Sequence, residues 1–429
     1  MQRQDRRAIP RNRLASIVGG SLGNLVEWYD WFAYASFAIY FAPVFFPEAD
    51  QTAQLLNTAA IFAIGFIVRP IGAWVMGRFS DNRGRKAGLT LSVALMFGGS
   101  LIIAAAPTYA TAGLLAPVTL LFARVLQGLS LGGEYGASAT YLSEMAPKDR
   151  RGFWASFQYS TLIGGQLVAV FVALVLQAIL TDEQLTAWGW RIPFVIGAFM
   201  ALGVFYLRRN MGETPAFEAQ AVDRPVSTAR LLWREHRRET VLVAMLSAGG
   251  GVGFYAYTAY MQKYLINTVG FAKDTANYVI AAALLYFLIL QPISGSLADR
   301  FGRKPMLLVY GIGGALAAVP VFMAMERVTS PVAAFLVLLV PLTLQSGYSA
   351  NNALVKAELF PAHIRGLGVA LPYAIGNAVF AGTVEMVALA LKGWGVERLF
   401  YVYVALVIAG AGVATMLLPE TRERSLIAD

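Results

Sequence analysis

Apolar residues occur along this chain in long runs that are separated by short polar segments. Twelve such runs are present, and each is close to or longer than the roughly 20 residues that an α-helix needs to cross a bilayer. The pattern predicts an all-α membrane protein with twelve transmembrane helices. The predicted spans are residues 16–46, 55–77, 88–106, 112–145, 153–181, 190–207, 239–268, 276–297, 306–325, 331–359, 366–391 and 397–418.

Charged residues are few and gather between the apolar runs. The chain of 429 residues is 57% hydrophobic and 14% charged, whereas soluble domains carry about 25% charged residues. Most of the 34 Lys and Arg residues lie near the termini and in the loops on one side. The positive-inside rule therefore places both termini in the cytoplasm. The basic N-terminus does not resemble a cleavable signal.

The composition also argues against several functional classes. The chain has no Cys and only two His residues, His236 and His363, both in predicted loops. A disulfide framework and a thiolate metal site are excluded. No nucleophile–base set and no ATP-binding loop is apparent, so neither an enzyme nor a primary pump is expected. The net charge of +9 arises from short loops between apolar runs, so no nucleic-acid partner is expected. No cofactor is expected either.

Two polar motifs occur twice, about half a chain length apart. GRFSDNRGRK at 77–86 returns as GSLADRFGRK at 295–304, and SEMAPKDRRG at 143–152 returns as AELFPAHIRG at 357–366. Such repetition indicates duplication of a six-helix unit. We expect six-helix bundles at 1–207 and 239–429, joined by a cytoplasmic linker at 208–238. Within the linker, VSTARLLWREHRRE mixes apolar and basic residues and predicts a short amphipathic helix on the inner leaflet.

The repeated loop motif resembles the G-x-x-x-D-R-x-G-R-[RK] signature of the major facilitator superfamily. The second copy matches it fully, whereas the first has Asn82 in place of the first Arg. RVLQGLSLGGEYGASATYLSE, GNLVEWYDWF, RPIGAWVMGR and WGWRIPF resemble its metabolite:proton symporter family. SFQYSTLIGGQ, TAYMQKYLINTVGF and KAELFPAHIRGLGV look like the 2-oxoglutarate (α-ketoglutarate) permeases of that family. The resemblance implies two pseudosymmetric bundles that rock around a central site.

The resemblance also implies a cytoplasmic gate built from the two motif copies. In this gate Asp81 faces the positive end of a helix dipole in the other half and pairs with a basic residue. The contact would hold the cytoplasmic side shut in the outward-facing state. The expected gate residues are Gly77, Asp81, Arg83, Gly84, Arg85, Gly295, Asp299, Arg300, Gly302 and Arg303.

Ionisable residues inside the predicted spans cost about 2.5–3.5 kcal/mol each, so they indicate function. Glu27 and Asp30 lie three residues apart and share a helix face. Two such carboxylates do not both ionise easily in a low dielectric, so one is expected to take and release a proton. The alternative is a structural pair held by Arg124. Pairing of Arg124 with ionised Asp30, broken when substrate competes for Arg124, is one physical route to coupling, and the resemblance favours Arg124 as a coupling residue. Glu134 is either a coupling group or a structural acceptor.

Candidate substrate contacts come from several predicted helices. Lys263 flanks a tyrosine stripe and supplies a compact cation for a carboxylate, although snorkelling to the interface is an alternative explanation. Arg69 and Arg191 have either substrate-binding or structural roles, and Glu385 is unassigned. The candidate substrate-binding residues are Lys263, Tyr260, Tyr159, Gln166, Arg69, Arg191 and Asn352.

These features predict a proton-coupled secondary transporter that imports a small dicarboxylate, and the resemblance indicates 2-oxoglutarate. Alternative substrates are a zwitterion such as proline or betaine, or another organic acid such as citrate or shikimate. A non-transporting nutrient sensor is the alternative from another class. The expected partners are the dicarboxylate, protons and the lipid bilayer. We expect a monomer in the bacterial inner membrane, with both termini in the cytoplasm.

Overall fold

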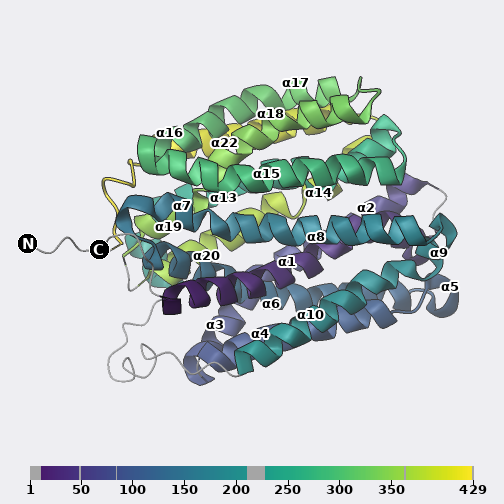
Figure 1. The fold of residues 1–429 in the computed structure, drawn as a ribbon, viewed down its shortest axis with the longest axis horizontal. Helices are drawn as coiled ribbons and strands as arrows, with labels where there is room; N and C mark the ends of the chain where they lie inside the picture. Colours follow the sequence, from purple (N-terminus) through teal and green to yellow (C-terminus); the bar gives the residue numbers. More distant parts are fainter. Residues whose placement is uncertain (1–10, 48–49, 84, 210–227, 362–363, 428–429) are drawn as a thin grey trace, which may run out of the picture.

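The structure, a computed structural model, describes residues 11–47, 50–83, 85–209, 228–361 and 364–427. Every regular element in these ranges is helical (Figure 1). The elements of the first half are α1 (Arg11–Phe45), α2 (Gln51–Ile67), α3 (Arg69–Arg83), α4 (Arg85–Ala105), α5 (Tyr109–Ala112), α6 (Leu115–Met145), η1 (Lys148–Arg150), α7 (Arg151–Ala155), α8 (Phe157–Ile179), α9 (Asp182–Ala187), η2 (Gly189–Arg191) and α10 (Ile192–Arg209).

The second half has the same all-helical character. Its elements are α12 (Ala229–Glu235), α13 (Arg237–Tyr257), α14 (Ala259–Tyr264), η3 (Leu265–Val269), α15 (Lys273–Phe301), α16 (Arg303–Leu308), η4 (Val309–Gly313), α17 (Gly314–Met325), α18 (Pro331–Ser349), α19 (Asn352–Leu359), α20 (Arg365–Gly376), η5 (Asn377–Ala381), α21 (Val384–Gly393) and α22 (Arg398–Leu417).

Many membrane crossings consist of shorter helices placed end to end. Ten described segments are long and apolar enough to cross a membrane. Together with α1 and the shorter apolar helix Thr90–Ala105, they make the twelve crossings that the sequence predicted. Helices α2 and α3 meet just before Pro70, which has no backbone N–H to donate. Three π-helical turns, η3, η4 and η5, interrupt the crossings of the second half.

The outer surface of the bundle is apolar. Trp74, Leu114, Phe199, Leu316 and Leu406 are between 67% and 74% exposed. In water such a surface would be unfavourable, whereas in a bilayer these side chains face lipid while the helices satisfy their own backbone polar groups. Polar and charged side chains consequently lie inside the bundle.

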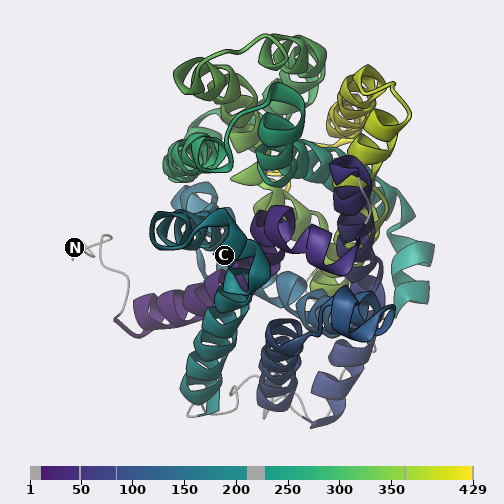
Figure 2. The same ribbon diagram turned by 90° about the vertical axis from the view of Figure 1, so that its right-hand side faces the viewer.

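The two halves pack side by side, with the first half lower and the second half upper in Figure 1. Figure 2 shows the same arrangement almost along the helix axes. Between the halves, α15 contacts α7 and α8, α2 contacts α21, and α20 contacts α6. We call the end of the bundle that carries α16 and the start of α7 the motif end, and the end that carries α5 and α9 the far end.

Helix α12 lies within the stretch that the sequence analysis assigned to a linker. Thr228 accepts a hydrogen bond from the backbone N–H of Leu231 and so caps the helix. Leu232 is buried, Leu231 packs against the same core and Trp233 is exposed, so two leucines attach this short helix to the bundle. Residues 210–227 of the linker lie outside the described ranges.

Candidate functional site

Two arginine side chains lie buried in the first half against the same tryptophan. The guanidinium carbon of Arg69 is 4.1 Å from the ring centroid of Trp31 and 3.9 Å from that of Phe66. The guanidinium carbon of Arg124 is 3.8 Å from the Trp31 centroid. Arg69 is 4% exposed and Arg124 is 0% exposed. The aromatic rings therefore hold two desolvated cations near the centre of the protein.

Both guanidinium groups keep N–H groups that are not hydrogen-bonded to the described part of the chain. Among the described residues, Nε and Nη2 of Arg69 and Nε and Nη2 of Arg124 have no hydrogen-bond partner. Cation–π contacts stabilise a charge but leave its N–H donors unsatisfied, and a buried donor without a partner is costly. A guanidinium group presents its donors in a fork that matches a carboxylate. The pair is therefore suited to an anionic ligand.

Glycines bring together the helices that carry these arginines. A Cβ at Gly128 would lie 3.1 Å from the carbonyl carbon of Gly65. Gly132, four residues later on α6, packs against the backbone of Arg69. Membrane helices approach closely where small residues recur at this spacing. This contact between α2–α3 and α6 places Arg69 and Arg124 in one region.

Asp30 is buried inside the first half and is held mainly by neutral groups. Ser100 donates a hydrogen bond from Oγ to Oδ1 of Asp30 at 2.5 Å, and Gln127 donates to Oδ2. Arg124 donates from Nη1 to Oε1 of Gln127 at 2.8 Å. The sequence predicted direct pairing of Arg124 with Asp30, whereas here Gln127 connects the cation to the acid.

Glu27 has different neighbours from Asp30. It is 3% exposed and lines a small cavity between the halves, together with Arg69, Tyr135 and Tyr373. The cavity offers about 10 Å³, which is about enough for one water molecule. Residues three apart on an α-helix differ in direction by about 60°. Glu27 therefore faces the cavity between the halves, while Asp30 contacts Ser100 and Gln127 inside the first half. This arrangement favours separate roles over a shared proton.

In the second half, Lys263 pairs with the acid that the sequence analysis left unassigned. Its Nζ lies 2.6 Å from Oε1 of Glu385, and the two side chains are 1% and 6% exposed. The positive charge of Lys263 is thus matched within the protein in this conformation. Tyr260 packs edge to face against Tyr264 and Phe400, which is a packing contact of the predicted tyrosine stripe.

The neutral candidates lie near the centre of the protein. Tyr159 is buried, and its ring centroid is 6.5 Å from that of Tyr348. Gln166 and Asn352 are also buried. In the described part of the chain, Oε1 of Gln166 and Nδ2 of Asn352 have no hydrogen-bond partner. Among the described residues they therefore provide one further acceptor and one further donor that are not hydrogen-bonded.

Arg191 lies away from the centre, at the far end. Its Nη1 donates to the carbonyl oxygens of Ala104 at 2.9 Å and Ala106 at 2.6 Å. These contacts satisfy carbonyls at the C-terminal end of α4, which agrees with the structural role given above as one alternative for Arg191.

The side chains of Glu134 and of the first motif copy lie outside what the structure describes. The gate residues concerned are Gly77, Asp81, Arg83, Gly84 and Arg85.

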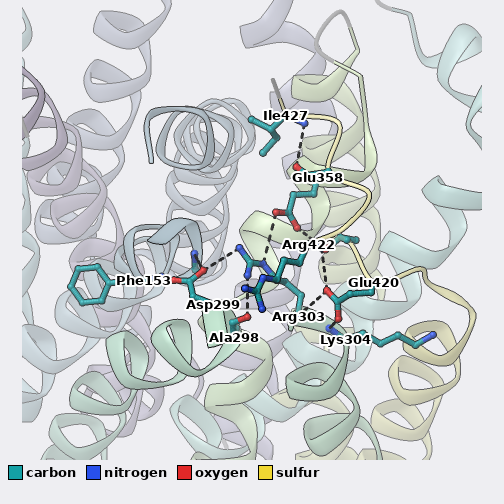
Figure 3. A network of polar contacts seen from close by, with 12 residues as sticks. Phe153, Ala298, Asp299, Arg303, Lys304, Glu358, Glu420, Arg422 and Ile427 are labelled. Atoms are coloured by element: carbon teal, nitrogen blue, oxygen red, sulfur yellow. Dashed lines mark hydrogen bonds and ion pairs between the residues drawn. The ribbon is translucent and has the colours of Figure 1, made fainter. Parts of the chain in front are cut away.

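The second motif copy joins the two halves at the motif end (Figure 3). Asp299 accepts hydrogen bonds from the backbone N–H of Gly152 at 2.8 Å and of Phe153 at 2.9 Å, at the start of α7. Nη2 of Arg303 lies 3.1 Å from Oδ1 of Asp299. A carboxylate is stabilised at a helix N-terminus by the helix dipole. The kind of contact that the resemblance implied for Asp81 is made by Asp299 here.

Glycine allows this contact between the halves to form. A Cβ at Gly152 would lie 2.5 Å from the carbonyl oxygen of Gly295, which is far inside van der Waals contact. Gly302 has a φ of 103°, a conformation that glycine adopts without strain. Arg300 contributes its carbonyl oxygen, which accepts a hydrogen bond from Arg422 at 3.0 Å.

The C-terminal segment is part of the same polar network (Figure 3). Glu420 accepts hydrogen bonds from the backbone N–H groups of Arg303 and Lys304, each at 3.0 Å. Ile427 is buried in an apolar cluster with Tyr135. The end of the described chain therefore helps to cover the motif end.

Hydrogen bonds also join the halves toward the far end. Gln262 donates from Nε2 to the carbonyl oxygen of Ser36 at 3.1 Å. Asn277 donates from Nδ2 to Oε1 of Gln177 at 3.1 Å. Since the halves are bridged at both ends around a very small cavity, the structure represents an occluded state.

Sequence reasoning missed three residues of this interior: Ser100, Gln127 and Lys356. Ser100 and Gln127 are neutral and do not differ in the sequence from other polar residues of the helices. Lys356 lies three positions before the end of α19 and is 0% exposed. A charge within the predicted span 331–359 was a signal that could have identified it.

Comparison with known proteins agrees with this architecture. Residues 17–224 and 218–428 each match the family described as sugar (and other) transporter. The chain is 47% identical over 408 residues to the alpha-ketoglutarate permease of Escherichia coli (strain K12), covering 95% of this chain and 94% of that relative. It is 34% identical to the citrate-proton symporter of Klebsiella pneumoniae, covering 88% of this chain and 85% of that relative.

A third relative and a solved structure extend the comparison. The chain is 31% identical to the proline/betaine transporter of Salmonella typhimurium (strain LT2), covering 96% of this chain and 84% of that relative. A crystal structure of the D-xylose-proton symporter superposes with a TM-score of 0.78 at 21% identity, covering 96% of this chain and 99% of that chain. This structural likeness shows a shared fold.

Proposed function

The chain belongs to the sugar (and other) transporter family of the major facilitator superfamily, and from this premise we propose that it imports a small dicarboxylate together with protons. 2-Oxoglutarate is the substrate best supported, because the chain is 47% identical to an alpha-ketoglutarate permease over nearly its whole length. The same relatives support a bacterial inner membrane as the location, and the basic loops support an orientation with the motif end in the cytoplasm.

One observation carries the substrate class: Arg69 and Arg124 are buried together, and four of their nitrogen atoms have no hydrogen-bond partner among the described residues. A dicarboxylate supplies acceptors for these donors. Arg69 also lines the cavity between the halves, so a bound carboxylate would lie where both halves can contact it. A site between the two halves agrees with the general position of substrate sites in such transporters.

The contacts of Arg124 suggest how substrate and proton are coupled. Arg124 reaches Asp30 through Gln127. A substrate carboxylate that takes up the charge of Arg124 removes a cation that stabilises the carboxylate form of Asp30. Asp30 then takes up a proton as the substrate binds. Because a dianion enters against a negative-inside potential, co-transported protons also offset its charge.

Alternating access would use the contacts at the two ends in turn. Opening to the cytoplasm requires Asp299 to leave the start of α7, and opening outward requires the Gln262–Ser36 and Asn277–Gln177 contacts to break. Each contact can bias the equilibrium only by its difference between states. No catalytic group and no cofactor other than the coupling proton is needed for this cycle.

The test is uptake of labelled 2-oxoglutarate into proteoliposomes with an imposed pH gradient. Succinate, citrate and proline serve as competitors. Replacing Arg69 or Arg124 with Gln is expected to raise the half-saturating concentration about tenfold to a hundredfold, the range for a hydrogen bond to a charged group. Arg398, which pairs with Glu326 at the surface, provides the matched control R398Q. Absence of gradient-stimulated uptake for every organic acid would overturn the proposal.

A zwitterion is the second candidate, and Glu27 favours it. Glu27 and Arg69 line the same cavity, and a carboxylate beside a guanidinium matches the two charges of an amino acid or betaine. The competition experiment separates the candidates. Proline inhibits uptake if the zwitterion is the substrate, whereas succinate inhibits if the dicarboxylate is.

A further inference from the structure

Lys356 in α19 is a buried cation that the transport cycle described above does not use. Its side chain is 0% exposed, and Nζ has no hydrogen-bond partner among the described residues. It contacts aromatic rings instead: Nζ lies 4.2 Å from the ring centroid of Tyr373 and 5.5 Å from that of Tyr135. An ammonium group has three donors, and none of them is satisfied by a described residue.

The two tyrosines beside Lys356 come from opposite halves of the protein. Tyr135 is on α6 and Tyr373 is on α20, and their rings stack in parallel with centroids 3.5 Å apart and an interplanar angle of 6°. Both rings also line the central cavity that contains Arg69 and Glu27. The stacked pair therefore adjoins both the central cavity and the ammonium of Lys356.

Two further polar groups that can donate hydrogen bonds lie close to Lys356. Asn352 is one helical turn before Lys356, so the two side chains share a face of α19. Its Nδ2 and the hydroxyl group of Tyr135 have no hydrogen-bond partner among the described residues. The region thus combines one positive charge with two neutral donors, and Lys356 forms no ion pair with an acid among the described residues. It is complementary to an anion.

Comparison with Lys263 shows why a purely structural role is a poor explanation. Lys263 is equally buried, and the protein supplies Glu385 as its counterion at 2.6 Å. Lys356 receives no such acid from the described residues. A buried ammonium without a counterion is destabilising, and an apolar side chain would fill the same space without that cost.

We propose that Lys356, Asn352 and Tyr135 form a second carboxylate-binding subsite, on the motif-end side of the Tyr135–Tyr373 pair. The inference rests on the proposed transport of an organic anion. Tyr135 and Tyr373 belong to different halves, so movement of the halves apart at the motif end separates the rings. Substrate released from Arg69 and Arg124 then passes to Lys356 before it leaves. Ile427 packs in the same cluster as the two rings and covers this route in the occluded state.

The test compares substrate binding from the two sides of the membrane. Proteoliposomes with known orientation are loaded with 2-oxoglutarate, and the half-saturating concentration for exchange is measured separately at the motif end and at the far end. The variants are K356M, which keeps the volume but removes the charge, and K356R, which keeps the charge. K273M is the matched control, since Lys273 pairs with Asp182 at the far end.

The expected result is asymmetric. K356M raises the half-saturating concentration at the motif end about tenfold or more, relative to the change at the far end. K356R recovers most of that loss, and K273M shows no asymmetry. The melting temperature of K356M without substrate stays the same or rises, because an unpaired buried charge has been removed.

Other results overturn the inference. Equal changes at both ends, or no change at either, would show that Lys356 does not receive substrate at the motif end. A large drop in melting temperature for K356M, restored in K356R, would show a structural cation. Failure of the proposed function is seen separately, because the wild-type protein would then exchange no organic anion at all.

Discussion

The Lys263–Glu385 ion pair allows a quantitative test of how charge is arranged in the second half. Replacing Lys263 with Met leaves the Glu385 carboxylate buried without its cation. The pair has a separation of 2.6 Å, and its side chains are 1% and 6% exposed, so it belongs to the buried class. Breaking such a pair by removing one partner costs about 3–5 kcal/mol. We expect K263M to lower the free energy of unfolding by that amount.

Removing both charges together should have a different effect. In the double variant K263M/E385L, no charge is left unpaired, and apolar side chains of similar size fill the space. Replacement of a whole buried pair is often neutral or stabilising, so we expect stability to return to the wild-type level. K273M is again a suitable control, because its partner Asp182 is 62% exposed and an exposed pair contributes about 0–1 kcal/mol.

The assays are denaturant titration of the purified protein in detergent and uptake of labelled 2-oxoglutarate by proteoliposomes. If Lys263 serves only to balance Glu385, the double variant regains uptake as well as stability. If the ammonium binds substrate, as the tyrosine stripe suggested, the double variant is stable but inactive. A single variant K263M that is as stable as the wild type would refute the reasoning, because Glu385 would not then depend on Lys263.

Three further predictions concern the first half and the motif end. Asp30→Asn should abolish uptake driven by a pH gradient while exchange of internal for external substrate continues, since an amide cannot carry the proton; both fluxes are measured in proteoliposomes. Gly295→Val should prevent closure of the motif end, because Gly152 leaves no room for a side chain. The measurement uses a cysteine introduced at Ser156, the only thiol in this otherwise Cys-free chain, which should react faster with thiol reagents in the Gly295→Val variant than in its absence. Asp50→Ala removes the cap of α2 and should cost about 1 kcal/mol of stability without altering transport.

Several features of this protein follow from local properties of the chain. The apolar runs are long enough to span a bilayer, so the crossings could be predicted from composition and length alone. The motif that contains Gly295, Asp299 and Gly302 occurs twice in the sequence, which predicted a duplicated fold, and its resemblance to the superfamily signature implied a gate contact. Asp30 and Arg124 were recognisable as functional candidates because a charged residue within a membrane span is energetically costly and therefore indicates a function.

The partners of those charges depend on how the helices pack. Gln127 lies between Arg124 and Asp30, and Glu385 neutralises Lys263, although nothing in the linear order links these residues. Successive residues point about 100° apart around a helix, so a small rotation of one helix would exchange every partner. That rotation is set by close contacts such as Gly128 against Gly65, and these exist only in the assembled bundle. The proposed role of Lys356 likewise depends on the assembled bundle, because only the structure shows that no acid among its described neighbours pairs with it.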